Sequence, residues 1–235
     1  RRNAAAGKIS GMLTIEEGAC CKGSAGVLRR MYELGVRMMT LTWNHENELA
    51  APQRNPGGVL VPQTEKGLTG KGFEFLAEME RMHMIVDVSH LSDKGFWDIA
   101  RHSIRPFAAS HSNCRALAPH TRNLTDEMIR ALSEHGGIAG LNYYAPFLDA
   151  DPTHPEKCRS TAALIAKHAA HYKQVGGAQM IALGSDFDGI DGPHQLENAA
   201  FLPLLADALR KEGFTEDEVE GIYYRNAMRF FEENL

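Results

Sequence analysis

The sequence predicts an α/β fold in which parallel strands alternate with helices, as in a TIM-type (β/α)8 barrel. Short apolar runs rich in Val, Ile, Met and Leu recur, and each is followed by a polar loop and a stretch with helical periodicity. Several runs are nearly continuous in apolar residues, which is typical of strands covered on both faces. The expected strands lie at 9–15, 36–42, 84–89, 106–110, 137–142 and 180–185.

Capping residues mark the helices between these strands. Thr125 is followed by two acidic residues, which favour the positive end of a helix, and Thr215 with Glu218 has the spacing of a capping box. A further helix is expected after Thr69, with Phe73, Leu76 and Ala77 facing inward, and others over 27–34, ending at Gly35, and over 164–172. Residues 43–68 contain three prolines and form a long irregular loop, of a length that is usually functional.

The composition is that of a soluble globular protein, and we expect one catalytic domain over residues 1–235. Hydrophobic residues make up 43% and charged residues 23% of the chain. The net charge of -5 is spread without runs of one sign, which argues against nucleic acid as a partner. No apolar run reaches the roughly 18 residues of a membrane span. The cysteines are sparse and show no CxxC spacing, which indicates reduced thiols and a cytoplasmic location.

The number of expected strands differs from that of a closed barrel. Six strand and helix units are two short of eight, and the usual barrel has roughly 250 residues or more. We therefore expect this chain to be a partial barrel that lacks the first one or two βα units.

Ionisable residues follow four of the expected strands. The active site of an α/β barrel lies at the carboxyl ends of the strands, so these side chains would lie together at that open end of the barrel, its mouth. Imidazoles and carboxylates suit Zn²⁺, and a carboxylate can bridge two metal ions about 3.5 to 4 Å apart. Any one of these residues could instead be a buried, hydrogen-bonded side chain, but four strand ends together favour a metal site. The residues are Glu16, Glu17, Asp87, His90, His111, Asp186 and Asp188.

Six short motifs occur in a fixed order: TIEEG at 14–18, MTLTWN at 39–44, IVDVSH at 85–90, ASHS at 109–112, TRN at 121–123 and GSDFDG at 184–189. Together they resemble the membrane (renal) dipeptidase family of zinc peptidases, particularly its bacterial members. The resemblance extends from Ile9 to the carboxyl terminus.

This resemblance implies hydrolysis of dipeptides by a water that two zinc ions activate. Glu16 matches the carboxylate that bridges both ions, and His90 and His111 complete the second metal site. Arg122 matches the arginine that holds the substrate, for which a guanidinium is suited. Asp186 matches the acidic residue near the bridging water and the substrate's amino group, and is the candidate proton shuttle. By chemistry alone, Glu17 is as good a ligand as Glu16.

The sequence departs from the family pattern in two places. The first zinc site of the family needs a His-x-Asp motif, and no segment before Glu16 supplies one. Trp43 stands where some members carry a histidine that contacts the substrate, and either Trp43 or His45 could shape the pocket. The nine other histidines are expected to be structural or solvated: His45, His83, His102, His120, His135, His154, His168, His171 and His194.

Three other interpretations stay open at this point. The chain could be a different metal-dependent amide or lactam hydrolase on the same barrel, because fold and metal do not determine substrate. It could bind a single zinc ion through Glu16, His90 and His111, since three protein ligands plus water describe many catalytic sites. It could also be an inactive fragment or a binding module with one metal site. The oligomeric state is open as well, and includes a homodimer.

Overall fold

A sheet of six parallel strands forms the centre of the computed structural model, which describes residues 2–53, 61–149, 154 and 157–235. Each strand pairs with the next one along the chain, in the order β1 to β6. This is the TIM-type α/β arrangement that the sequence predicts. The strands are β1 (Leu13–Glu16), β2 (Val36–Thr40), β3 (Ile85–Asp87), β4 (Ala108–Ala109), β5 (Ile138–Leu141) and β6 (Ile181–Leu183).

The strands fall where the apolar runs predict them, with one correction at the start of the chain. β1 begins at Leu13 and not at Ile9. The side chain of Ile9 is 99% exposed, so it has no partner to pack against. The prediction of a strand over 9–12 is therefore wrong, because an apolar side chain alone does not provide a neighbouring strand.

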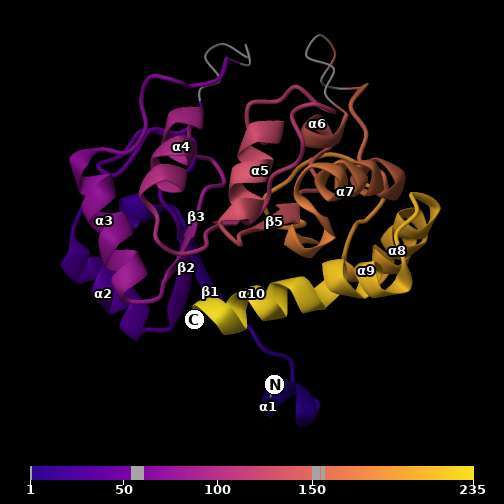
Figure 1. Ribbon diagram of the computed structural model, residues 1–235, viewed down its shortest axis with the longest axis horizontal. Coiled ribbons are helices and arrows are strands. Elements are labelled where there is room, and N and C mark those ends of the chain that lie inside the picture. The colour runs from indigo at the N-terminus through magenta and orange to yellow at the C-terminus, as the bar shows by residue number, and fades with distance from the viewer. Residues whose placement is uncertain (1, 54–60, 150–153, 155–156) are drawn as a thin grey trace.

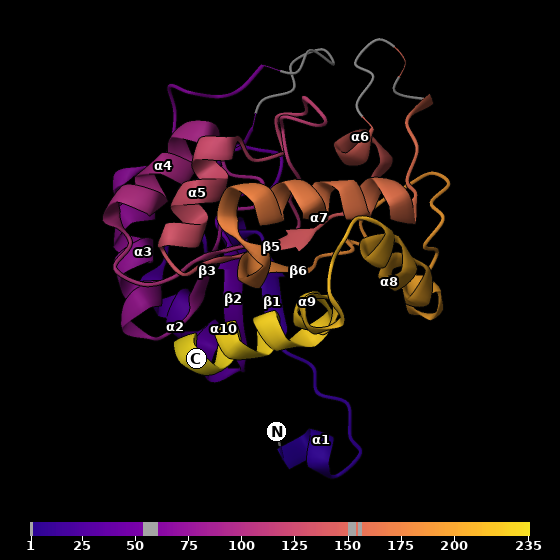
Figure 2. The ribbon, with the colours of Figure 1, turned by 45° about the vertical axis from the view of Figure 1, so that its right-hand side comes forward.

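Helices cover the outside of the sheet (Figures 1 and 2). Each of the five long helices that follow β1 to β5 begins after a capping residue, whose side chain accepts a hydrogen bond from the first turn of the helix. The capping residues are Ser24, Thr69, Ser92, Thr125 and Thr161. These helices are α2 (Ala25–Glu33), α3 (Gly70–Arg81), α4 (Asp93–His102), α5 (Asp126–Glu134) and α7 (Ala162–Gly176). The short helices α1 (Arg2–Ala5) and α6 (Ala145–Leu148) complete this part of the chain.

The inner face of α3 differs from the prediction. Phe75, Leu76 and Met79 are buried, whereas Phe73 is only half-buried and Ala77 is exposed. The buried positions follow the spacing of one helical face, which excludes Ala77. Only Leu76 of the three residues predicted to face inward is therefore fully buried.

The last helices close the amino ends of the strands. After α8 (Leu202–Lys211), the predicted capping box of Thr215 and Glu218 starts α9 (Glu216–Glu220). A π-helical turn, η6 (Gly221–Arg225), joins α9 to α10 (Asn226–Asn234), and Figure 1 shows α10 crossing the end of the molecule opposite to α6. Phe230 of α10 is fully buried in a cluster with residues at or next to the start of β3 to β6: Ile85, Ala108, Ile138 and Ala182.

Two glycines let the backbones of neighbouring strands approach closely at the opposite, carboxyl end of the sheet. A Cβ atom on Gly140 would lie 1.9 Å from the carbonyl oxygen of Ser110, and one on Gly184 would lie 2.1 Å from the same oxygen. No side chain fits there without moving backbone. The loops that follow β4, β5 and β6 are therefore held close to one another.

The loop between β2 and α3 is irregular where it is described, as predicted; Pro56 lies outside the described residues. The side chain of Asn47 organises its start, because its Nδ2 donates to the carbonyl of Leu41 at 2.8 Å while its Oδ1 accepts from the backbone of Leu49 at 2.8 Å. An isolated bridge joins Pro52 to Leu91. The loop thus lies against the segment that follows β3.

Among the described residues, no helix is both long enough and apolar enough to cross a membrane.

Closure of the amino end by α10 leads to a stability prediction. Replacing Phe230 with Ala should lower the free energy of unfolding by about 3–5 kcal/mol, because it leaves a cavity under four strands. Urea denaturation measures this loss. Met228 on the same helix is 41% exposed, and M228A should change the free energy by less than about 0.5 kcal/mol. Equal effects of the two substitutions would contradict the packing described here.

Candidate metal centre

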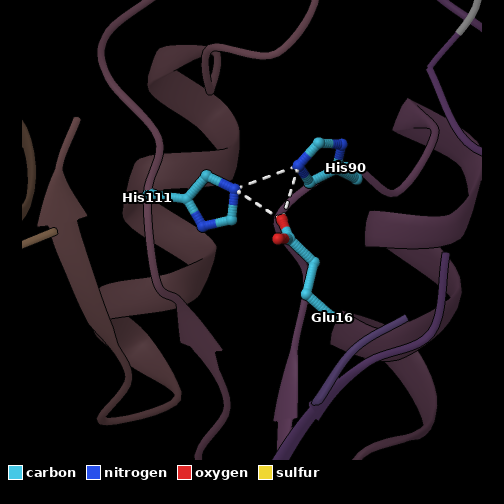
Figure 3. A group of neighbouring side chains, drawn as sticks. All are labelled: Glu16, His90 and His111. Carbon is cyan, nitrogen blue, oxygen red and sulfur yellow. Dashed lines mark hydrogen bonds and ion pairs between the residues drawn. The ribbon is translucent and has the colours of Figure 1, made fainter. Parts of the chain in front are cut away.

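Three side chains from three strands converge at the carboxyl end of the sheet (Figure 3). Glu16 is the last residue of β1, His90 follows β3, and His111 follows β4. Glu16 Oε1 lies 2.9 Å from His90 Nε2 and 3.2 Å from His111 Nε2, and the two Nε2 atoms are 3.0 Å apart. Each residue offers one ligand atom, and these atoms all lie within 4.8 Å of one another. Among the described residues this is the one such group.

The charge state of this cluster suits a cation. The hydrogen bonds from His111 and His90 hold the pKa of the Glu16 carboxyl well below its usual range. Burial, with a smaller contribution from the positive charge of Arg122, lowers the pKa of His90 to about 3. At neutral pH the cluster therefore contains a carboxylate and a neutral His90 imidazole with a free lone pair.

The outer ring nitrogens determine where the lone pairs of the histidines point. Ser110 Oγ donates its proton to the Asp87 carboxylate, so it accepts from His111 Nδ1, which is 2.7 Å away. His90 Nδ1 likewise lies 3.2 Å from Asn44 Oδ1, a hydrogen-bond acceptor. With the proton on Nδ1, each ring would offer an unprotonated Nε2 to a metal ion in place of its present contact with Glu16. Such outer partners are usual for histidines that bind metals.

Asp87 is the buried acceptor behind this arrangement. It ends β3 and is 2% exposed. Besides the Ser110 hydroxyl, its oxygens accept from the backbone N–H groups of Ser89 at 3.0 Å and Ser110 at 2.9 Å, and from Thr40 Oγ1 at 3.1 Å. A carboxylate with four donors is fully satisfied, and it holds the segments that carry both histidines.

Backbone strain is present at two of the predicted site residues. His90 has a φ of 69° and Asp186 a φ of 62°, in the left-handed region that residues other than glycine rarely adopt. Such conformations persist where the surrounding contacts determine them, and they are common at functional sites.

Arg122 lies in the same mouth as a buried cation. Its side chain is buried, and none of Nε, Nη1 and Nη2 has a hydrogen-bond partner among the described residues. The ring of Phe147 lies beside it, with the guanidinium carbon 5.3 Å from the ring centroid. Burial lowers the pKa of Arg122 to about 10, so the guanidinium stays protonated at neutral pH. An unpaired buried charge is costly, which indicates a site for an anionic or carbonyl oxygen.

A second arginine holds the segment that carries Arg122. The guanidinium of Arg115 pairs with Asp93 at 2.7 Å and also donates to the carbonyls of Thr121 at 2.8 Å and Asn123 at 2.8 Å. These carbonyls flank Arg122 on both sides. The position of Arg122 in the mouth is therefore set by a partly buried ion pair.

Asp186 lies beyond the end of β6, on the same cavity. Its Oδ2 accepts a hydrogen bond of 3.0 Å from Asn142 Nδ2. The cavity has a volume of about 690 Å³, which is sufficient for a small ligand. Its lining includes Glu16, Glu17, Trp43, Asn44, Gln53, His90, His120, Thr121, Arg122, Tyr144, Phe147, Asp186, Gly189, Ile190 and Asp191.

The predicted site residues are thus brought together around one cavity. Glu16, His90 and His111 are in contact, and Arg122 and Asp186 share the lining with Glu16 and His90. Glu17, the other candidate ligand, instead accepts from the backbone N–H of Trp43 at 3.1 Å. Geometry therefore favours Glu16 over Glu17, and among the described lining residues Trp43 is present and His45 is not.

Sequence reasoning missed His120 as a residue of the site. His120 lines the cavity, and its Nδ1 accepts the backbone N–H of Arg122 at 3.1 Å. Burial lowers its pKa to about 4, so it is neutral at neutral pH. Its spacing of two residues before Arg122 was the only available signal.

Comparison with known proteins places this chain in a family. The family model described as membrane dipeptidase, peptidase family M19, matches residues 1–234. The chain belongs to the membrane dipeptidase family. The resemblance that the six sequence motifs indicate is therefore confirmed.

Relatives within and near this dipeptidase family cover nearly all of the chain. An uncharacterized protein in the pqqA 5' region of Klebsiella pneumoniae is 36% identical over 225 residues, which are 94% of this chain and 81% of that protein. Dipeptidase aclJ of Aspergillus oryzae is 36% identical over 233 residues, which are 95% of this chain and 51% of the relative. The chain thus spans about half the length of the fungal dipeptidase.

A solved structure supports the same fold. The metallopeptidase from Rhodobacter sphaeroides, crystallised with a phosphinate mimic of the dipeptide L-Ala-D-Ala, matches with a TM-score of 0.90 and 31% identity. The match covers 98% of this chain and 65% of that one.

The link from Asp87 through Ser110 to His111 can be tested by metal binding. S110A removes the acceptor of His111 Nδ1 and should weaken Zn²⁺ binding about 10-fold to 100-fold, because the imidazole loses its orientation. Competition with a chromophoric chelator measures the affinity. Ser133 Oγ donates to the carbonyl of Gly176 on the outside of the fold, and S133A should leave the affinity unchanged. Unaltered Zn²⁺ affinity in S110A would show that this link does not orient the histidine.

Proposed function

We propose that this protein is a zinc-dependent dipeptidase whose catalytic residues are those around the cavity. One observation carries the proposal: Glu16 and His90, which form a three-ligand cluster with His111, line the same cavity as the buried guanidinium of Arg122. This guanidinium has no hydrogen-bond partner among the described residues. A cation site beside an unpaired cation is suited to a ligand that contributes oxygen atoms to both.

The donor set fits Zn²⁺. Two unprotonated imidazole nitrogens and one carboxylate oxygen are ligands that zinc prefers, and three protein ligands leave a position open for water or substrate. When bound, zinc would lower the pKa of water and polarise a carbonyl group. Glu16 is the most exposed of the three ligands, with its side chain 42% accessible, so its second oxygen is free to face another ion. If the site held two zinc ions, Glu16 would be the residue that holds both.

The other residues of the cavity suit the two ends of a peptide bond. Arg122 would bind a carboxylate or carbonyl oxygen of the substrate, because its side-chain nitrogens have no partner among the described residues and the ring of Phe147 covers one side. Asp186 would accept the proton of the attacking water and pass it to the leaving amino group. Its carboxylate lies on the cavity wall and accepts a hydrogen bond from Asn142.

Zinc-dependent hydrolysis tests the ligand assignment. H90A and H111A in the full-length enzyme should each abolish zinc-dependent hydrolysis of dipeptides, because two ligands do not hold the ion in place. A panel of L,L and L,D dipeptides, assayed with and without chelator, measures the activity. His171 pairs with Asp126 between α5 and α7, away from the cavity, and H171A should retain turnover. Normal turnover in H90A would overturn the assignment.

Arg122 gives an independent prediction, because its roles in stability and activity oppose each other. R122M should lower kcat/KM by about 100-fold or more. The free energy of unfolding of the metal-free protein should be unchanged or higher, because an unpaired buried charge is removed. In contrast, R115M breaks the ion pair with Asp93 and should lower the free energy of unfolding by at least about 2 kcal/mol. An R122M protein that is less stable yet fully active would show that Arg122 is structural.

A further inference from the structure

Three asparagines are completely buried at the carboxyl end of the sheet. Asn113 and Asn123 belong to the loop between β4 and α5, and Asn142 follows β5. Each has 0% exposed surface. Buried amides are costly unless both their donors and their acceptors are used, so their partners decide what they do.

Asn113 joins the loop to the end of β5. Its Oδ1 accepts from the backbone N–H of Asn142 at 3.0 Å, and its Nδ2 donates to the carbonyl of Asn142 at 3.0 Å. One side chain therefore pairs with both backbone groups of Asn142, as a neighbouring strand would. The backbone N–H of Asn113 in turn donates to Asn123 Oδ1 at 3.2 Å.

Asn123 extends the connection to the surroundings of Arg122. Its Nδ2 donates to the carbonyl of Phe147 at 2.9 Å, and Phe147 is the residue whose ring lies beside the guanidinium. Asn123 also directly follows Arg122 in the chain. The segment that carries Arg122 is thus bonded to the segment that carries Asn142.

The side chain of Asn142 uses its two ends differently. Its Oδ1 accepts from the backbone N–H of Tyr144 at 2.6 Å, and its Nδ2 donates to Asp186 Oδ2 at 3.0 Å. Among the described residues, no other side chain donates to the Asp186 carboxylate. Asp186 also holds a left-handed backbone conformation, which needs support from its contacts.

We propose that Asn142 is a positioning residue that holds the Asp186 carboxylate toward the cavity. Through Asn113 and Asn123 the same network sets the distance between Asp186 and Arg122. The catalytic consequence rests on the dipeptidase function proposed above, whereas the hydrogen bond itself does not.

The substitution N142D isolates the bond. It keeps the shape of the side chain and an oxygen to accept from Tyr144, but replaces the donor toward Asp186 with a second carboxylate oxygen. In the double variant N142D/D186N the pair is restored with its polarity reversed, because the amide then stands at position 186. A direct bond therefore predicts rescue, and a general packing role does not.

The wild type, N142D, D186N and N142D/D186N form a double-mutant cycle. Thermal unfolding of the full-length protein at pH 8 measures this cycle without any assay of activity. N142D should lower Tm by about 3 °C or more in the wild-type background and by less than about 1 °C in the D186N background. If N142D lowers Tm equally in both backgrounds, the proposal is overturned. This comparison holds even if N142D partially unfolds the protein. Rescue by the double variant supports it.

Kinetics then test the positioning role. N142D should lower kcat at least about 10-fold and change KM less than about 3-fold, because the metal ligands and Arg122 are untouched. The matched control is N226D, since Asn226 Nδ2 donates to the carbonyls of Ala178 at 2.9 Å and Ile181 at 2.8 Å near the amino end of β6. N226D should lower Tm and leave kcat unchanged. Wild-type kcat in N142D would overturn the positioning role.

The dipeptidase function and the positioning role of Asn142 can be refuted separately. If the wild-type enzyme hydrolyses no dipeptide, the proposed function is wrong, and the Tm cycle still decides whether Asn142 holds Asp186. If the enzyme is active but the cycle shows no coupling, the proposed function stands and the role of Asn142 is refuted.

Discussion

The hydrogen-bond register of the parallel sheet is the constraint on which the metal cluster depends. Glu16 pairs with Thr40 across β1 and β2, and Thr40 pairs with Asp87 across β2 and β3. These residues therefore end their strands in one row. Because each strand pairs with the next in sequence, His90 and His111 emerge only a few residues beyond that row and meet Glu16. A shift of register in β1 would turn Glu16 to the other face of the sheet.

The buried polar side chains at the carboxyl end of the sheet differ from Arg122 in their hydrogen-bond partners. Asp87 and the asparagines find partners within the protein, so they stiffen the loops in an environment where each unmade bond is costly. The backbone N–H of Arg122 donates to His120 Nδ1, whereas its guanidinium has no hydrogen-bond partner in the part of the chain that the structure describes. This contrast supports the view that the buried amides position the site and that Arg122 is kept for a ligand.

Much of the fold and the charged part of the site could be predicted from the sequence. Buried parallel strands need nearly continuous apolar runs, and the residues directly after these runs must share one end of the sheet, which brings Glu16, His90 and His111 together. Ser110, His120 and Asn142 gave no comparable signal, because their hydrogen bonds depend on which loops meet in space. The exposed Ile9 shows the opposite case, in which an apolar residue without a neighbouring strand does not form one.

Glu16, His90 and His111 are proposed to hold a zinc ion in this dipeptidase-family protein. Anomalous diffraction from crystals of the full-length protein, recorded on both sides of the zinc absorption edge, tests it most directly. We expect an anomalous peak within bonding distance of Glu16 Oε1, His90 Nε2 and His111 Nε2. A zinc-loaded protein whose anomalous signal lies elsewhere, with these three atoms bonded only to one another, would contradict it.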